Sequence, residues 1–460
     1  MSSDPLRWKS RVRYFLAWSS SFGPLLAFYR WAYRAIIAFA VALFRRCDGI
    51  RALYLVRGCS KKEITPGVSD IDFIVIVNDD ARQRRRAESV FSLLQTLTAS
   101  LIPYHPAWVR TEEALDYMWR NMPLWRYRLQ EGKSNWSLLL GRDVLASLPA
   151  INDMDRRTAC FGEMNYWWVQ FCDFILQNDK YRHDNLIRNS ICYKAVAEVL
   201  NARHALISGE FCYSKEDALR REDSPLTRKL LATRADRRLE SDKALEQQCY
   251  RFLIAAFSEV WDRFRDDPFL QVYPEVGQEV DTSGAEIEKE KSGKPFQEIA
   301  GFLAAKWGPV CRGIHLLRSA FWQVEDLLLF VEVDPAALPT LEQLEELINV
   351  AKEAYSAYSI PVILFLRLPH LAFPLTPSAP RDFNRGVLTP ATTPDVFLQL
   401  GEQDVYWSTY SNWYLVDWER NWQWLDASPQ KRTQLNIIAQ GAAAGHVRYP
   451  LSLSSISGRA

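Results

Sequence analysis

The feature of this 460-residue chain that most constrains its fold is a pair of aspartates at the entrance to an apolar run. Asp70 and Asp72 stand at the start of Ile71–Val77, and Asn78-Asp79-Asp80 ends that run. Branched apolar residues bounded by turn formers predict a β-strand. Side chains two positions apart on a strand project from one face, so the carboxylates share a face while Phe73 points the other way into a core.

Two adjacent carboxylates repel each other and need a cation to neutralise them. A hard dication, Mg²⁺ or Mn²⁺, that also bridges nucleotide phosphates is the usual solution. The preceding strand, expected at 52–56, ends at Gly58, where the missing side chain lets backbone amides approach a phosphate. Gly58 lies twelve residues before Asp70, which allows the chain to turn and bring the two strand ends together.

The surrounding pattern predicts an α/β domain over residues 1–145. Apolar residues at helical spacing predict a helix over 81–101, and a further strand is expected at 107–110. Strands that alternate with helices are typical of an α/β domain. From 150 to 273 the periodicity is helical throughout, with Gly209 ending one helix, and this predicts an all-helical second domain.

The last part of the chain is expected to form a further unit behind a linker. Residues 274–295 are rich in charge and poor in apolar side chains, which predicts a flexible segment. Residues 296–460 predict a smaller, aromatic-rich α/β unit, with strands at 327–333 and 361–365 around a helix over 341–358.

The N-terminal region contains an apolar stretch from Phe22 to Phe44 that Arg30 and Arg34 interrupt. Its uncharged core, residues 35–44, is about half of the roughly 20 residues that a bilayer span needs, so a transmembrane helix is not expected. We expect a helix packed on the first domain. The alternative is a helix at a membrane surface, because aromatic residues and flanking arginines suit that interface.

Composition limits the class of partner and the compartment. Lysine plus arginine (56) and aspartate plus glutamate (55) nearly cancel, which argues against a dedicated nucleic-acid-binding protein but leaves room for a nucleotide ligand. Eight cysteines without a CxxC pair indicate reduced thiols rather than a disulfide scaffold. With no secretory signal pattern at the start, the expected location is cytoplasmic. The oligomeric state is not indicated.

The stretch Gly58-Cys59-Ser60, followed by Pro66-Gly67-Val68-Ser69-Asp70-Ile71-Asp72-Phe73, resembles the nucleotidyltransferase superfamily. This is the group of DNA polymerase β and of the aminoglycoside-modifying nucleotidyltransferases, and the likeness is strongest to small bacterial members. The family pattern is a Gly-Ser or Gly-Gly pair, a short spacer, and acid–apolar–acid at a strand start. The resemblance covers about residues 35–115.

The resemblance implies roles for particular residues. Asp70 and Asp72 would be the catalytic pair and would hold two Mg²⁺ ions. The residues that would bind the nucleotide are Gly58, Cys59, Ser60 and Ser69. A hydroxyl of the acceptor would attack the α-phosphate of a nucleoside triphosphate such as ATP and expel pyrophosphate.

Two departures from the family pattern are visible. Cys59 follows the glycine where the family usually has serine. Active members carry a third carboxylate on a later strand, but the expected strand at 107–110 holds no acid, and Glu112, Glu113 and Asp116 lie just beyond it.

The resulting hypothesis is an α/β (α+β) nucleotidyltransferase domain, an all-helical domain and a smaller C-terminal α/β unit. The expected activity is Mg²⁺-dependent transfer of a nucleoside monophosphate to a hydroxyl of a small molecule or a protein. The alternative is a catalytically inactive member that binds a nucleotide or a protein partner. Arg188 and Lys194 on a predicted helix could contact a triphosphate, although surface charge is the simpler interpretation of both.

Overall fold

The computed structural model describes residues 5–267, with gaps at 62, 104–108, 122, 178–183, 213, 237–241 and 265–266, and shorter stretches between 298 and 375. The fold is mixed α/β. The chain divides into two compact units, one formed by Met1–Glu163 and Asn178–Leu245, the other by Met164–Gln177 and Glu246–Ala460. The helices α7 (Asp153–Cys172) and α11 (Lys243–Phe264) carry the chain from one unit to the other.

The first unit is built on a four-stranded sheet in the order β3-β2-β1-β4. The strands are β1 (Ile50–Val56), β2 (Asp72–Val77), β3 (Val109–Thr111) and β4 (Ser137–Gly141). β1 runs antiparallel to both β2 and β4, whereas β2 and β3 are parallel. The helix α4 (Ala81–Leu97) connects the two parallel strands, as such a crossover requires.

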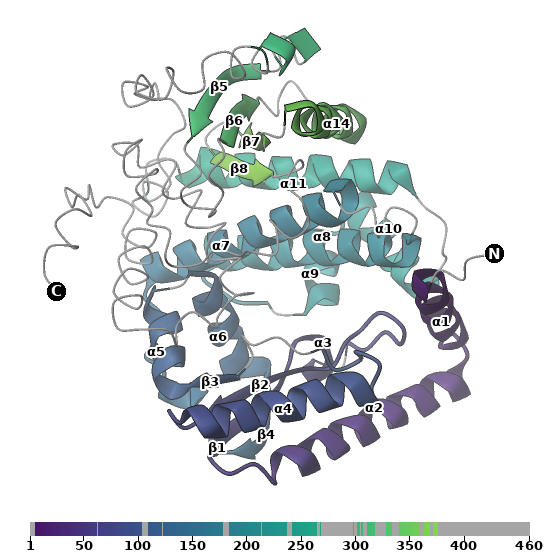
Figure 1. The fold of residues 1–460 in the computed structure, drawn as a ribbon, viewed down its shortest axis with the longest axis vertical. Helices are drawn as coiled ribbons and strands as arrows, with labels where there is room; N and C mark the ends of the chain where they lie inside the picture. The colour runs from purple at the N-terminus through teal and green to yellow at the C-terminus, as the bar shows by residue number, and fades with distance from the viewer. Residues whose placement is uncertain are drawn as a thin grey trace, which may run out of the picture. The chain divides into compact units, whose positions relative to one another are not determined.

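One face of this sheet is covered by α2 (Gly23–Phe44) together with α4 (Figure 1). The ring of Phe44 on α2 packs edge-on against Phe91 of α4 and Phe73 of β2, with ring centroids 5.1 and 6.3 Å apart. All three rings are fully buried. Phe73 therefore points into a core, as its position in the strand predicts, and Asp72 belongs to the opposite face.

The other helices of the first unit lie before, between and after the strands. They are α1 (Pro5–Ser19), α3 (Arg57–Ser60), α5 (Glu112–Asn121), α6 (Pro123–Asn135), α8 (Asn185–Ser208), α9 (Lys215–Glu222) and α10 (Pro225–Asp236). The expected stop at Gly209 is present, because this glycine adopts φ 83° and its amide bonds to Ala205 at the end of α8. Helices thus dominate the chain from Asp153 onward in this unit, as the periodicity predicts.

The second unit contains a separate four-stranded sheet in the order β5-β6-β7-β8. Its strands are β5 (Cys311–Leu317), β6 (Leu328–Val333), β7 (Val362–Leu368) and β8 (Leu371–Leu375), with α14 (Leu341–Tyr358) between β6 and β7. Trp168 of α7 is fully buried in this unit and packs against Tyr250 and Phe257 of α11. The order β6, α14, β7 confirms the strand–helix–strand pattern expected at 327–365.

Some boundaries differ from the sequence prediction. α4 ends at Leu97, four residues early, because Ala99 and Ser100 adopt left-handed backbone angles that stop the helix. The edge strand β4 was not expected. The predicted linker at 274–295 and residues 376–460 of the aromatic-rich unit lie outside the described residues.

Among the described residues, α2 is the one helix that is long and apolar enough to cross a membrane by length and composition. It is also packed on the first unit, as expected. Its buried residues Tyr33, Ala40 and Phe44 form the stripe that contacts the domain.

Candidate functional site

The aspartate pair lies where the end of β1 meets the start of β2. Val56 pairs with Asp72 in the antiparallel register, so the chain segment that follows β1 begins next to the pair. Asp72 is buried, with 8% of its surface exposed. Asp70 reaches solvent, although protein surrounds it on most sides. The predicted meeting of the glycine turn and the carboxylates is therefore present, and it lies wholly within the first unit.

The segment from Arg57 to Asp70 is held by bonds to its own backbone and to α2. The buried thiol of Cys59 donates to the carbonyl oxygen of Asp70 at 3.2 Å. The amide of Thr65 donates to Oγ of Ser69 at 2.8 Å, and the hydroxyl of Tyr33 donates to the Ser69 carbonyl at 2.7 Å. These bonds fix the backbone immediately before Asp70.

Burial and the two aspartates raise the pKa of Cys59 to about 12, and burial, Cys59 and Asp70 raise the pKa of Tyr33. The Cys59 thiol is therefore protonated at neutral pH and serves as a hydrogen-bond donor inside the turn. The hydroxyl of Ser60 likewise donates to the Arg57 carbonyl at 2.8 Å. Of the predicted nucleotide-binding residues, Cys59, Ser60 and Ser69 all have side chains that bond within this segment.

The surroundings of Asp70 disfavour its ionised form. Loss of water around the carboxylate, followed by the charge of Asp72, raises the pKa of Asp70 to about 6. Lys194, Arg13 and Arg57 act in the opposite direction without cancelling that effect. Such a pair holds negative charge at neutral pH against its own repulsion, which is the condition that a bound dication relieves.

The three cations come from different parts of the first unit. Lys194 lies on α8 and is half-buried, and burial lowers its pKa although Asp70 and Asp72 raise it. Arg13 belongs to α1, and Arg57 begins α3 with a left-handed φ of 59°. Lys194 is therefore not a fully exposed cation, and its charge interacts with those of Asp70 and Asp72.

A buried ion network ties the same segment to the helices. The ammonium of Lys215, at the start of α9, lies 3.0 Å from Glu198 of α8 and 3.3 Å from Glu63. The Glu63 carboxylate also accepts a bond from the Lys215 amide at 3.2 Å. Burial alone would lower the pKa of Lys215, but Glu198 and Glu63 raise it. A second pair, Lys61 with Glu131, anchors the other side of the turn.

The two glycines of the segment face different constraints. Gly67 has φ +83°, and a Cβ there would lie 2.5 Å from the Arg13 carbonyl and 3.1 Å from the Ala17 amide of α1. At Gly58 a Cβ would meet only the Glu63 carbonyl, at an ordinary 3.5 Å, and the backbone is not left-handed. The fold therefore requires glycine at 67 but not at 58.

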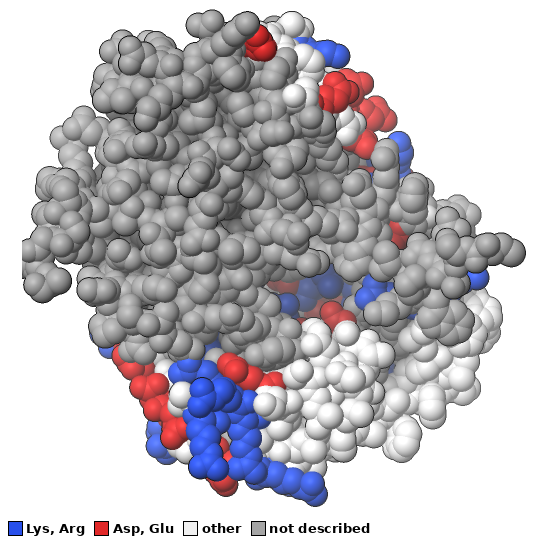
Figure 2. Space-filling model, in the orientation of Figure 1, with Lys and Arg blue, Asp and Glu red and all other residues white. Residues whose placement is uncertain are grey.

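A charged cavity of about 890 Å³ opens beside this segment. Its charged lining comprises Arg30, Lys61, Glu63, Glu216, Arg220, Arg228 and Arg234. Figure 2 shows acidic and basic side chains gathered at a recess at the level of α3 and α9. The excess of arginine and lysine suits an anionic ligand, and the volume is in the range of small-molecule sites.

The parallel register of β2 and β3 decides whether an acid that follows β3 can serve as the third carboxylate of the family pattern. Val109 lies opposite Val75 and Thr111 opposite Val77, at the far end of β2 from Asp72. Glu112 begins α5 beyond that end, about 16 Å along the sheet from the pair. Its carboxylate bonds instead to Arg142. The acids just after β3 therefore do not reach the aspartates.

The donor set that remains is two carboxylates, and no group of three or more His, Cys, Asp or Glu side chains with metal-site geometry occurs among the described residues. Mg²⁺ commonly binds proteins through one or two carboxylates and completes its shell with water and substrate phosphates. The crowded, partly desolvated charge of Asp70 fits that mode. Asp70 and Asp72 would hold the ion.

Comparison with known proteins found no family model and no curated sequence that matches this chain.

Sequence reasoning did not assign Arg13, Tyr33, Arg57, Glu63 or Lys215 to the site, and it offered Lys194 as a triphosphate contact only beside the simpler interpretation of surface charge. A signal existed only for Lys194, which follows a buried stripe on α8. The others are brought to the aspartates by tertiary contacts between segments far apart in the chain.

Proposed function

We propose that the chain is a nucleotidyltransferase that transfers a nucleoside monophosphate from a nucleoside triphosphate to a hydroxyl of a small polar molecule or a protein. The observation that carries the proposal is the Asp70–Asp72 pair at the start of β2, next to the Gly58 turn and surrounded by three cations. The resemblance of the motif to the nucleotidyltransferase superfamily supports it. The expected place of action is the cytoplasm.

Mg²⁺ or Mn²⁺, when bound, would supply charge neutralisation for the attacking and leaving oxygens. Asp70 and Asp72 would hold it on one face of the strand. Lys194 on α8 would neutralise phosphate charge, because its ammonium is near enough to Asp70 for that carboxylate to raise the pKa of Lys194. Gly58 would let the triphosphate approach the backbone, and this explains a glycine where the fold itself accepts a Cβ.

The cavity beside Lys61 and Glu63, where basic side chains outnumber acidic ones, would receive part of the triphosphate or the acceptor. Its wall includes Tyr193, the neighbour of Lys194 on α8. The balanced net charge of the whole chain gives no track for a polynucleotide, so the preferred acceptor is a small molecule or a protein.

The test is pyrophosphate release from each of the four common nucleoside triphosphates with Mg²⁺ or Mn²⁺, against a panel of hydroxylated acceptors. Release that Asp70→Asn and Asp72→Asn abolish is the expected result. Full release by either variant contradicts the proposed roles of the aspartates.

A readout independent of turnover is the rise in melting temperature that Mg²⁺ gives the protein. We expect this rise in the natural chain and its loss in Asp70→Asn. Lys229→Met is a matched control, since Lys229 pairs with Asp242 in an ion pair outside the site and should leave the Mg²⁺ response intact.

A second candidate function is a non-catalytic nucleotide sensor on the same site. The register observation favours it, because no acid of the described β3 or of the start of α5 reaches the pair. Tight Mg²⁺-dependent nucleotide binding without pyrophosphate release would support the sensor, and any release that depends on Asp72 would exclude it.

A further inference from the structure

The helices α1 and α2 expose an aromatic surface. Large apolar side chains that are 37–64% exposed follow one another along it: Val12, Phe15, Trp18, Phe22, Leu25, Phe28, Trp31 and Phe39. The Trp18 and Phe22 ring centroids are 5.3 Å apart, and on α2 those of Phe28 and Trp31 are 6.1 Å apart. Most exposed large apolar side chains of the described residues belong to this surface.

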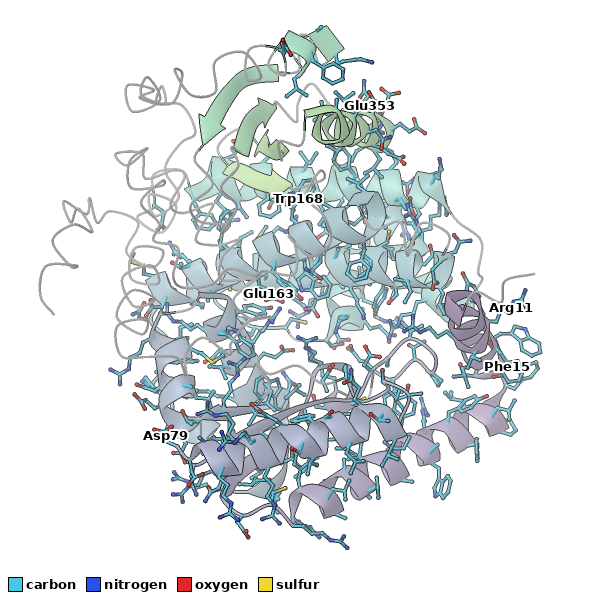
Figure 3. All side chains as sticks on the ribbon, viewed as in Figure 1. Arg11, Phe15, Asp79, Glu163, Trp168 and Glu353 are labelled. Atoms are coloured by element: carbon cyan, nitrogen blue, oxygen red, sulfur yellow. The ribbon has the colours of Figure 1, made fainter. Side chains whose placement is uncertain are left out.

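On α2 the surface follows one stripe of the helix rather than scattered positions. Phe28, Trp31, Ala35, Phe39 and Ala42 are all exposed and recur at helical spacing, so they form a single stripe. Figure 2 shows a broad, predominantly uncharged area over α1 and α2, and in Figure 3 Phe15 and Arg11 project outward from α1. Apolar patches of this kind mark interaction surfaces.

Charge identifies the partner. The segment Pro5–Cys47 holds basic residues and no acidic residue. Because the whole chain has a net charge of +1, the rest of it is net acidic. Arg11, Arg34 and Arg45 are exposed; Arg11 lies one turn from Phe15 on α1, and Arg34 and Arg45 lie three positions after Trp31 and Ala42, at the edge of the stripe. An apolar aromatic face edged with arginines is the pattern of a helix that lies at a membrane surface and attracts anionic lipid.

The contacts of α2 keep it in the plane of such a surface. Its opposite stripe is buried on the first unit, and the Tyr33 hydroxyl is bonded to the Ser69 carbonyl beside Asp70. A helix so attached would have to leave the sheet in order to cross a bilayer. The two helices are also joined, since Ser19 and Tyr29 hydroxyls lie 2.8 Å apart.

We propose that the exposed face of α1 and α2 docks the protein onto a membrane surface that carries anionic lipids. Trp18, Phe28 and Trp31 enter the headgroup boundary, and the arginines bind lipid phosphates at the edge. This docking does not depend on the transferase activity.

The test is flotation of the full chain with vesicles of phosphatidylcholine alone and of phosphatidylcholine mixed with phosphatidylglycerol. We expect flotation with the mixed vesicles, weaker flotation with phosphatidylcholine alone, and loss at high salt. Phe28→Ser/Trp31→Ser should lower the vesicle partition coefficient by at least about tenfold, since two large apolar groups leave the interface. Arg34→Glu/Arg45→Glu should remove the preference for anionic vesicles.

Matched controls lie on α4. Leu93 and Leu97 are 47% and 59% exposed, and Arg82 and Arg85 are exposed, but none is on the aromatic surface. Leu93→Ser/Leu97→Ser and Arg82→Glu/Arg85→Glu should float like the natural chain. Absence of flotation by the natural chain, or equal losses in the test and control variants, would overturn the proposal.

A second copy of the chain is the competing occupant of this surface. If light scattering finds a dimer that Phe28→Ser/Trp31→Ser dissociates, and vesicles do not bind the natural chain, the surface is a self-association interface and the proposal is wrong. Circular dichroism melting shows whether each variant keeps its fold.

Discussion

The two four-stranded sheets share a plan over three strands and differ in what they carry. In the first, β1 is antiparallel to β2, and β2 is parallel to β3 through α4. In the second, β5 is antiparallel to β6, and β6 is parallel to β7 through α14. Even the irregularity near the start of the first strand recurs, between Ile50 and Ala52 and between Cys311 and Gly313.

The register makes the comparison residue by residue. Val56 pairs with Asp72 in the first sheet, and Leu317 pairs with Leu328 in the second. The second sheet therefore has leucine where the first has its buried carboxylate. The same plan of strands occurs with and without the aspartate pair, so the proposed activity would depend on a few residues at one strand start and not on the sheet.

The largest effect is expected at that strand start. Asp72→Asn should lower pyrophosphate release by roughly a thousandfold or more, because the substitution removes a charge that would hold the metal. Asp326 precedes Leu328, the first residue of β6, by two positions in the sequence, as Asp70 precedes Asp72, the first residue of β2. Asp326→Asn should stay within about twofold of the natural rate if the second sheet takes no part in catalysis. Similar losses in both variants would break the comparison.

The connection after β1 is longer than the connection after β5 and is held by the Lys215 network. Lys215→Met should lower the free energy of unfolding by about 3–5 kcal/mol, because Glu63 and Glu198 would be left buried without their cation. The control is Arg220→Met, which breaks an exposed pair with Glu216 and should cost no more than about 0.5 kcal/mol. Urea unfolding measures both. Equal costs would show that the network does not hold the segment.

The two glycines in that connection have different expected roles, Gly67 in stability and Gly58 in nucleotide binding. Gly67→Ala should destabilise the protein by about 2 kcal/mol, from its left-handed backbone and the Cβ contact with the Arg13 carbonyl. Gly58→Ala should leave stability within about 0.5 kcal/mol and weaken nucleotide binding. Thermal melting and a nucleotide titration of each variant measure the two effects. Unchanged nucleotide affinity in Gly58→Ala would mean that ligand approach does not require a glycine there.

The smallest effect concerns the charge of Asp70 without metal. Its folded-state pKa of about 6 lies above the usual value, so the folded protein binds this proton more tightly than the unfolded chain, and ionisation costs stability at neutral pH. In EDTA at pH 7, Asp70→Asn should be more stable than the natural chain by about 1 kcal/mol, a value reduced for the solvent that Asp70 reaches. The difference should shrink as the pH falls through 6 toward 4. Urea unfolding across that range measures it, and a difference that stays constant with pH would mean that ionisation of Asp70 is not its cause.

Sequence patterns were sufficient for elements that local properties determine. The branched run after Asp72 and the helical periodicities of 81–101 and 341–358 predicted β2, α4 and α14, because burial of one face requires those periods. β4 was missed, since Ser137–Gly141 is a short edge strand whose only definition is its pairing with β1.

The candidate site was predictable in part for the same reason. The spacing of Asp70 and Asp72 fixes their common face, but it does not say which distant groups approach them. Surface charge is the simpler interpretation of Lys194 from sequence, because the pattern along α8 shows burial and not direction. The acids after β3 could be excluded only once the pairing of Val109 with Val75 was known.

The contact between Gly67 and α1 has a practical consequence for protein production. Because the N-terminal segment is apolar and basic, it is an obvious segment to truncate when soluble protein is to be produced. The backbone of α1 at Arg13 and Ala17 closes over Gly67, and Arg13 contributes charge at Asp70. A shortened chain that begins after α1 would keep both aspartates but lose the backbone that covers Gly67 and one cation near Asp70, so measurements on it would describe a different site.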